Sequence, residues 1–250
     1  KRNRYTIADV RNAPMVAWPL TRLDICVMSD GAAATIFASE EGIKRLEAAG
    51  AKIPRPLVKV TGIGRGTDMM RMADRPHVDY DYFMENYATE QEKSSDETKA
   101  YYKKLWEHGT RYPGVHSFRA GRTAGNMAWK HAGIQDPLNE LDFVELHDAF
   151  TIMSALSLEA NGFAKRGEGW RLAQEGKLAL TGELPALTMG GQKARGNPLG
   201  ASSLYQLVEA ALQLRGQAGK NQVQGARRAL VQALGGPAST AVTHVLEAWQ

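Results

Sequence analysis

The chain changes from strand to helix at Glu145-Leu146-His147-Asp148-Ala149-Phe150. Asp142 to Leu146 is a short apolar run that predicts a strand, and Phe150 to Ala160 has the apolar spacing of a helix. His147 and Asp148 therefore lie directly between a strand and the helix that follows it. In open α/β sheets this position holds ligand-binding side chains, and a histidine there can donate a hydrogen bond to a developing oxyanion. We interpret His147 as a candidate catalytic residue.

A glycine-dense loop leads into another predicted helix, which covers Ala201 to Leu214. The loop reads Gly190-Gly191-Gln192-Lys193-Ala194-Arg195-Gly196-Asn197-Pro198-Leu199-Gly200-Ala201. Its glycines allow close backbone approach, and its free amides lie near a helix N-terminus. Taken alone, each of these two segments also has a simpler explanation. A histidine at a strand end often has its hydrogen bonds satisfied within the fold, and a glycine-rich loop is often only a tight turn.

The first 64 residues predict two strands and a helix. Thr35 to Ala38 is a β-prone run that predicts a buried strand, and Ser39 caps a short helix that ends at Gly50. Arg55 to Gly64 predicts the next strand, which ends at its glycines Gly62 and Gly64. The order strand, helix, strand indicates an α/β fold.

The rest of the chain adds a helix and a β-hairpin. The helix starts at Arg119, stops at Gly133 and has an apolar stripe of Ala120, Ala124, Met127, Ala128 and Ala132. Ala229 to Leu234 and Thr240 to Leu246 flank the turn Gly235-Gly236-Pro237, which predicts an antiparallel hairpin.

A long insertion is predicted at about residues 66–118, where periodicity weakens. Nine aromatic residues lie between Tyr80 and Phe118. These rings either pack the insertion onto its own domain or form the wall of a pocket or a partner surface. We expect the segment from Tyr80 to Tyr112 to cover the pocket mouth or a subunit contact, because nine exposed rings would form a large apolar patch.

Composition restricts the chemistry of this chain. It has 250 residues, a formal net charge of +4 spread along the sequence, and one cysteine, Cys26. A disulfide or a cysteine-based metal cluster within the chain is excluded, and we expect a soluble protein of the reducing cytoplasm without a metal site. No run of about 18 apolar residues predicts a membrane span, and the charge does not indicate nucleic-acid binding.

Four ordered motifs resemble the C-terminal half of the thiolase superfamily, in the branch of sterol carrier protein thiolases and lipid-transfer acyl-CoA enzymes. The resemblance covers nearly the whole chain. The His147-Asp148 segment is similar to the family's His-Asp-x-Phe motif, and the glycine loop to its Gly-Gly…Gly-His-Pro-x-Gly-Ala motif. The other two motifs are Ser29 to Ala34 followed by Ser39-Glu40-Glu41, and Glu209 to Gly216.

The resemblance implies a layered fold of two α/β halves, each with a mixed five-stranded sheet and helices on both faces. It also implies a dimer that acts on coenzyme A thioesters, without a permanently bound cofactor. Residues 1–54 would end the N-terminal half, and residues 55–250 would form the C-terminal domain. The family's nucleophilic cysteine lies upstream of this segment, so Cys26 is interpreted as structural. The chain is then a C-terminal fragment, or its N-terminal half is a separate polypeptide or was not included.

Three departures from the family pattern bear on mechanism. Asn197 stands where the family has a catalytic histidine, and an amide cannot titrate near pH 7. Ala149 and the turn at Gly235-Gly236 stand where many members have a second, acid/base cysteine. Leu187 stands where the family commonly has asparagine, so a polar contact is expected to be missing.

Two hypotheses from different classes follow from the resemblance. In the first, an acyl-CoA acyltransferase makes or breaks a carbon–carbon bond, with His147 holding the oxyanion and Asn197 supplying a neutral hydrogen bond. Gly191, Gly235 and Gly236 form the substrate loops, and Tyr205 is either a proton relay or a helix-packing residue.

Specialised members of this branch are retro-aldolases or aromatic acyl-CoA thiolases, often with an OB-fold zinc-bearing partner subunit. In the second hypothesis the chain is a non-catalytic acyl-CoA or lipid-binding protein. Retention of both His147 and Asp148 beside the glycine loop favours the enzyme.

Overall fold

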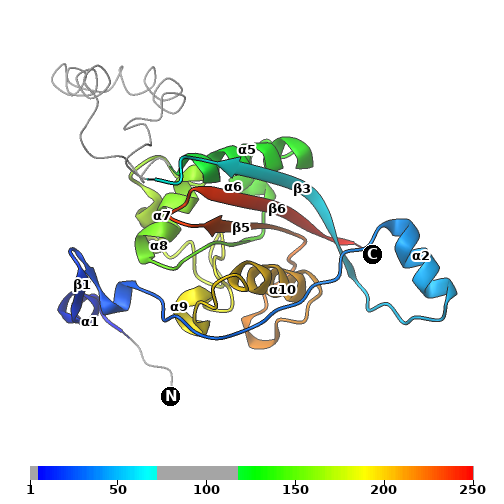
Figure 1. The fold of residues 1–250 in the computed structure, drawn as a ribbon, viewed down its shortest axis with the longest axis horizontal. Coiled ribbons are helices and arrows are strands. Elements are labelled where there is room, and N and C mark those ends of the chain that lie inside the picture. The colour runs from blue at the N-terminus through cyan, green and yellow to red at the C-terminus, as the bar shows by residue number, and fades with distance from the viewer. Residues whose placement is uncertain (1–4, 72–117, 250) are drawn as a thin grey trace.

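The protein is an α/β structure built on one mixed sheet (Figure 1). The computed structural model describes residues 5–71 and 118–249. The sheet order is β3-β6-β5-β4. The strands are β3 (Leu57–Thr67), β4 (Phe143–Glu145), β5 (Arg228–Gly235) and β6 (Thr240–Trp249). In the described part of the chain the sheet thus has four strands, one fewer than the resemblance implies.

Strand pairing places the short strand β4 at one edge of the sheet. β3 and β6 pair antiparallel, from Leu57 opposite Trp249 to Thr67 opposite Thr240. β5 and β6 form the antiparallel hairpin predicted from the sequence. β4 pairs parallel to β5, so the carboxyl ends of both strands lie at the same end of the sheet. The segment after β4, which includes His147, therefore emerges at the end of the sheet where β5 also ends.

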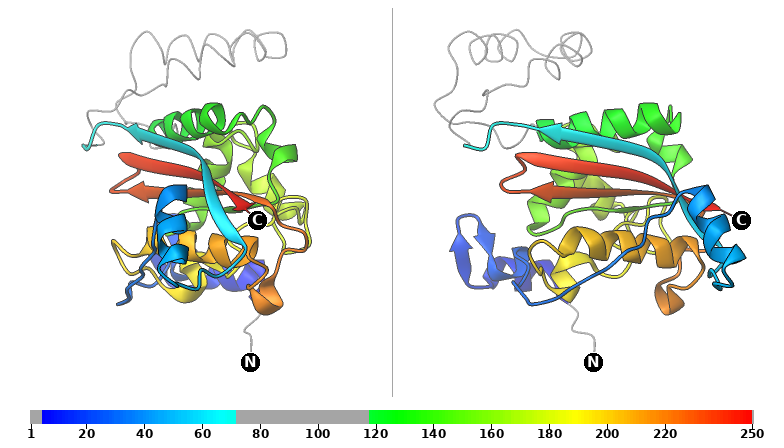
Figure 2. Two further views of the ribbon diagram at one scale, coloured as in Figure 1. Left: turned by 90° about the vertical axis from the view of Figure 1, so that its right-hand side faces the viewer. Right: turned by 45° about the vertical axis from the view of Figure 1, so that its right-hand side comes forward.

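Helix α5 (Arg119–Ala132) covers one face of the sheet, and helix α10 (Ser202–Leu214) covers the other (Figures 1 and 2). Alternate residues along the strands face these two layers. Phe143 of β4 belongs to the buried cluster that contains Ala210 and Leu214 of α10. Val144 belongs to the opposite cluster with Trp129 of α5. Glu145 follows Val144 and so returns to the α10 side.

Helix α5 approaches β3 unusually closely because small residues meet on both surfaces. A Cβ atom on Gly62 would lie 2.9 Å from the Cβ of Ala132, and one on Gly66 would lie 2.8 Å from the carbonyl carbon of Ala120. Real Cβ atoms essentially never approach other atoms this closely. Gly62 and Gly64 therefore do not end the strand as predicted; they let it continue to Thr67 beneath the helix.

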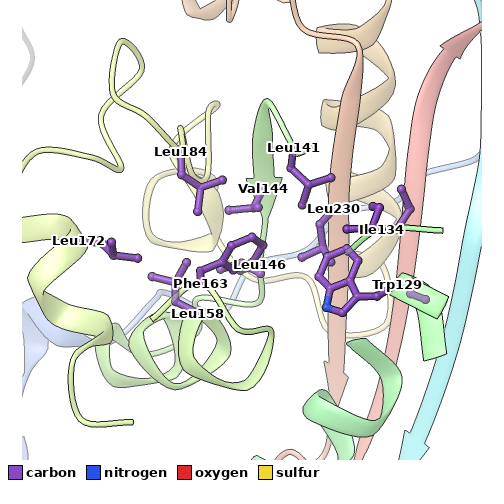
Figure 3. Packing of buried hydrophobic residues seen from close by; sticks show 12 residues of the cluster. Trp129, Ile134, Leu141, Val144, Leu146, Leu158, Phe163, Leu172, Leu184 and Leu230 are labelled. Carbon is purple, nitrogen blue, oxygen red and sulfur yellow. The ribbon is translucent and has the colours of Figure 1, made fainter. Parts of the chain in front are cut away.

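The main apolar cluster lies between the sheet and helices α5, α7 (Thr151–Ala160) and α8 (Gly169–Gln174) (Figure 3). The rings of Trp129 and Phe163 meet edge to face, with centroids 6.1 Å apart. Leu158, Leu172 and Leu230 are further buried members of the cluster. This cluster fixes α7 at the end of β4, next to the segment that carries His147.

The other elements are short, and five of them precede β3 in the chain. They are α1 (Ile7–Asn12), β1 (Met15–Ala17), β2 (Leu20–Thr21), η1 (Arg22–Asp24), α2 (Glu40–Ala48), α6 (Pro137–Glu140), α9 (Gly191–Arg195) and η4 (Gly219–Asn221). β1 and β2 pair as a separate two-stranded sheet. In residues 5–71 and 118–249, no helix is both long enough and apolar enough to span a membrane.

Most of the predicted elements are confirmed, including the helices after Ser39, Arg119, Phe150 and Ala201. The predicted strand over Thr35 to Ala38 is wrong. That segment has no regular secondary structure, and Ile36 and Phe37 are 95% and 64% exposed. A β-prone run becomes a strand only where another strand pairs with it, and here none does within the described residues.

The expectations for the apolar stripe of α5 and for the start of the insertion need correction, and the expectation for the aromatic segment cannot be compared with the structure. Met127 lies outside the buried stripe of α5 and is half exposed, whereas Ala120, Ala124 and Ala128 are fully buried. The predicted insertion starts too early, because residues 66 and 67 belong to β3. The aromatic segment from Tyr80 to Tyr112 lies outside the described residues. Phe118 is described and is buried against α5.

Candidate active site

Asp148 joins the end of β4 to the glycine loop. Its carboxylate accepts hydrogen bonds from the backbone N–H of Gln192 at 2.7 Å and of Lys193 at 3.3 Å. Gly191 packs against the same carboxylate, since a Cβ there would lie 2.7 Å from the Asp148 Cγ. Burial raises the pKa of Asp148, while these backbone hydrogen bonds oppose the rise. The two segments singled out in the sequence therefore form one site.

His147 lies next to Asp148 and contacts the same loop. Its Nδ1 is 2.9 Å from Nε2 of the Gln192 amide. Burial, with a smaller contribution from the positive charge of Arg195, lowers the pKa of His147 to about 4. The ring is therefore neutral at physiological pH and can take part in hydrogen bonds without carrying charge.

Asn197 is buried and is held by backbone and side-chain contacts. Its N–H donates to the Val27 carbonyl at 2.8 Å, and its carbonyl accepts from the N–H of Ser29 at 3.4 Å. The Ser202 hydroxyl donates to Asn197 Oδ1 at 2.5 Å. Because Ser202 occupies Oδ1, the NH₂ group is the donor side of the amide, and it faces the Cys26 thiol.

Residues 25–29 connect the two halves of the site. Ile25 forms a β-bridge with Phe150, and Met28 forms one with Asn197. Between them, the N–H of Cys26 donates to the Ala149 carbonyl at 2.9 Å. Cys26, which was interpreted as structural, is half-buried, hydrogen-bonds to the Asn197 side chain and lines a cavity of about 220 Å³. Burial raises the pKa of its thiol, so the neutral form is favoured.

A buried charged cluster lies behind the loop, on the α10 side. Arg195 Nε donates to Glu209 Oε1 at 2.8 Å, and the guanidinium lies 5.2 Å from the centroid of the Tyr205 ring. Glu145 accepts hydrogen bonds from the N–H and the hydroxyl of Thr188 at 2.9 and 2.8 Å. Burial, and then the negative charge of Glu209, raise the pKa of Glu145 to about 8.

The remaining predicted site residues occupy different places. The Tyr205 hydroxyl lies against Gly31, where an added Cβ would be 2.7 Å away, so this tyrosine has clear packing contacts. Gly235 ends β5 and Gly236 begins the turn to β6, and their nearest side chains are Thr240 and Ser239. Their part in substrate binding stays a prediction.

Sequence reasoning missed three residues that the structure places at the site: Gln192, Cys26 and Glu145. Glu145 lies in the strand-to-helix segment and Gln192 in the glycine loop, the two segments singled out in the sequence. A polar side chain inside a glycine loop and an acid in an apolar strand were the signals that could have indicated them.

The fold and site define an α/β protein in which a strand-end His-Asp pair is joined to a glycine loop before a helix. The family model described as thiolase C-terminal domain-like matches residues 107–248. The chain therefore belongs to the thiolase C-terminal domain-like family.

Similar proteins agree with this assignment. The acetyl-CoA acetyltransferase of Methanothermobacter thermautotrophicus is 32% identical, over 97% of this chain and 51% of its own. Sterol carrier protein 2 of Homo sapiens is 30% identical, over 96% of this chain and 37% of its own. This chain thus spans about half of the length of the first relative and about a third of the second.

A solved structure shares the fold. The Ltp2-ChsH2(DUF35) aldolase aligns with a TM-score of 0.67 and 23% sequence identity, over 98% of this chain and 51% of that one.

Proposed function

We propose that this chain is the C-terminal half of a cytoplasmic, homodimeric acyltransferase that makes or cleaves the carbon–carbon bond next to a coenzyme A thioester. The observation that carries the proposal is the neutral His147 beside a loop that Asp148 fixes in place. The similarity to an acetyl-CoA acetyltransferase supports the substrate class.

In this proposal the nucleophilic cysteine lies outside the chain. As it adds to the thioester, the carbonyl oxygen gains negative charge, and an N–H of His147 stabilises that charge without transferring a proton. Asn197 donates from its NH₂ group to the acyl or enolate oxygen, since Ser202 occupies its Oδ1. The backbone N–H of Gly191 assists, whereas the next two N–H groups of the loop donate to Asp148. Any proton that moves must use another group, such as water, Tyr205 or the substrate.

A second candidate is a retro-aldol cleavage of a hydroxyacyl-CoA, in which this chain works with an OB-fold zinc-bearing partner. Asn197 favours it, because retro-aldol cleavage forms no acyl-cysteine and so needs no histidine at this position to activate a thiol. The Ltp2-ChsH2(DUF35) aldolase shares the fold, and its name includes a DUF35 component. A non-catalytic acyl-CoA-binding protein is the third outcome, and it predicts binding without turnover.

Replacing His147 with alanine tests the proposal directly. We expect kcat/KM for thiolysis or cleavage of a coenzyme A thioester to fall about 10²- to 10³-fold, because one oxyanion donor is lost. The measurement is consumption of coenzyme A in thiolysis, or release of aldehyde in cleavage, by the complete enzyme. His131→Ala is the control, since His131 is an exposed histidine on α5 that contacts the N–H of Ile63. Unchanged turnover in His147→Ala would refute the oxyanion role.

Replacing Asn197 with histidine separates the two reactions. We expect the native cleavage to fall by about two orders of magnitude, because the amide donor fixed by Ser202 is lost. Rates of acetoacetyl-CoA thiolysis and of hydroxyacyl-CoA cleavage are measured side by side. A large rise in thiolysis with the native rate intact would show instead that Asn197 is a lesion of an ordinary thiolase.

A further inference from the structure

Gln192 contacts both members of the His147-Asp148 pair. Its backbone N–H donates to Asp148 Oδ1 at 2.7 Å, and its side-chain Nε2 lies 2.9 Å from His147 Nδ1. The residue is fully buried, at 0% exposure. Asp148 therefore fixes the backbone from which the Gln192 side chain reaches the imidazole, so the amide is held in place on both sides.

The contact has chemical consequences for the ring. An amide nitrogen donates hydrogen bonds and does not accept them, so the Nδ1 that faces it must offer its lone pair. A neutral imidazole carries one proton, and that proton must then be on Nε2. The charged form would have a proton on Nδ1 as well, which would point at the N–H of the amide.

The opposite amide orientation is less favourable. As the structure stands, the buried atom of Gln192 without a hydrogen-bond partner is Oε1. Turning the amide over would satisfy Oε1 with an Nδ1–H group but would remove the contact of the buried NH₂. Orphaned buried N–H groups are rarer in proteins than under-satisfied carbonyl oxygens.

We propose that Gln192 is a positioning residue that holds His147 as the neutral Nε2–H tautomer, so that the ring presents an N–H donor to the substrate. This inference rests on the proposed function only in taking the recipient to be the thioester oxygen. The tautomer itself is a property of the protein before any substrate binds. With its lone pair on Nδ1 engaged and its proton on Nε2, His147 is a fixed donor and not a general base.

The charges around the ring agree with this role. Arg195 of α9 opposes an imidazolium at His147. Asp148, the adjacent carboxylate, is directed to the backbone amides of Gln192 and Lys193. Because a neutral donor keeps its proton, the donor function should not change between about pH 5 and 8.

The test is NMR of the full-length protein with ¹⁵N-labelled histidine, without substrate, with the His147 signals assigned from the His147→Gln variant. We expect the two-bond ¹⁵N–¹H correlation pattern of the Nε2–H tautomer from about pH 5 to 8. In Gln192→Glu, a carboxylate replaces the donor and accepts a hydrogen bond from an Nδ1–H group. We expect the signals to change to the Nδ1–H or charged form, with a titration that enters this pH range.

A second variant keeps the inference testable if Gln192→Glu does not fold. Gln192→Met keeps the length of the side chain but has no donor, and we expect a mixture of both tautomers. With substrate, kcat should be about 10- to 100-fold lower and KM little changed, because the donor is misdirected while binding remains. Gln206→Met, a change of another fully buried glutamine, is the control, and its His147 signals should match those of the unaltered protein.

The outcomes separate this inference from the proposed function. An Nδ1–H pattern in the unaltered protein, or His147 signals unchanged in both Gln192 variants, would overturn it. An Nε2–H pattern that changes as expected in the variants supports it, even where no acyl-CoA turnover is found. Absence of acyl-CoA turnover together with this NMR pattern would count against the proposed function alone.

Discussion

Replacing Gly64 with alanine should unfold the protein or reduce its stability by more than about 4 kcal/mol. A Cβ at this position would lie 2.7 Å from the carbonyl carbon of Ala124 and 2.8 Å from the amide nitrogen of Ala128, and closer still to the Ala124 carbonyl oxygen. These are backbone atoms of α5, so no side-chain rotation relieves the clash. The helix would have to move off the sheet, and Ala124 and Ala128 would lose their buried contacts.

The measurement is urea unfolding followed by circular dichroism, with Gly42→Ala as the matched control. Gly42 lies in the first turn of α2, and a Cβ there would meet the Ser39 hydroxyl at an ordinary 3.4 Å. Alanine is the better helix former, so the control should be neutral or stabilising by up to about 1 kcal/mol. A midpoint for Gly64→Ala equal to that of the unaltered protein would show that α5 does not lie this close to β3.

The glycines of β3 show what local pattern can and cannot predict. Periodicity predicted the strand, because alternation and β-branched residues are local properties. It did not predict the function of Gly62 and Gly64, since the same residue type marks both strand ends and close backbone approach. The spacing of two residues, continued by Gly66, places all three on one face. That regularity was the available sign of a helix packed directly on the strand.

Thr35 to Ala38 illustrates the opposite failure. Its composition favours a strand, yet strand formation depends on a pairing partner from elsewhere in the chain. Within the described residues Ile36 and Phe37 remain exposed. Local preference therefore gave the wrong answer where the deciding contact was distant in sequence.

The site was predicted in outline and missed in its polar interior. His147 and Asp148 were found because a strand-to-helix junction and a glycine loop have recognisable local patterns. Their connection through Gln192 depends on contacts 44 and 45 residues apart in sequence. No local pattern reports such contacts. The burial of Glu145 could not be predicted from the sequence either, because it depends on the packing of β4 against the α10 side of the fold.

Glu145→Gln should remove a large pH dependence of stability. Burial, and then the negative charge of Glu209, raise the pKa of Glu145 from 4.5 to about 8. The folded state therefore binds this proton more tightly than the unfolded state. The stabilisation is fully present below about pH 4.5 and is lost as pH rises through about 8. One pKa unit corresponds to about 1.4 kcal/mol, so the full loss is of the order of 5 kcal/mol.

Glutamine keeps the carbonyl oxygen that accepts from Thr188 but cannot ionise. The variant should therefore have nearly the stability of the unaltered protein at about pH 5 and be several kcal/mol more stable at about pH 9. Urea unfolding at a series of pH values gives this difference. Comparing the two proteins cancels the opposite contribution of His147, whose lowered pKa of about 4 costs stability as pH falls below 6.5.

Glu41→Gln is the matched control, because its side chain is 73% exposed in an ion pair with Arg45 on α2. Its pH profile should run parallel to that of the unaltered protein, since a surface ion pair contributes little. If the Glu145→Gln profile also ran parallel, Glu145 would titrate as a solvated carboxyl. The segment at Thr188, and with it the start of the loop that reaches His147, would then have to be open to water. A difference that grows between about pH 5 and 9 would instead show that a protonated carboxyl is part of the folded site at neutral pH.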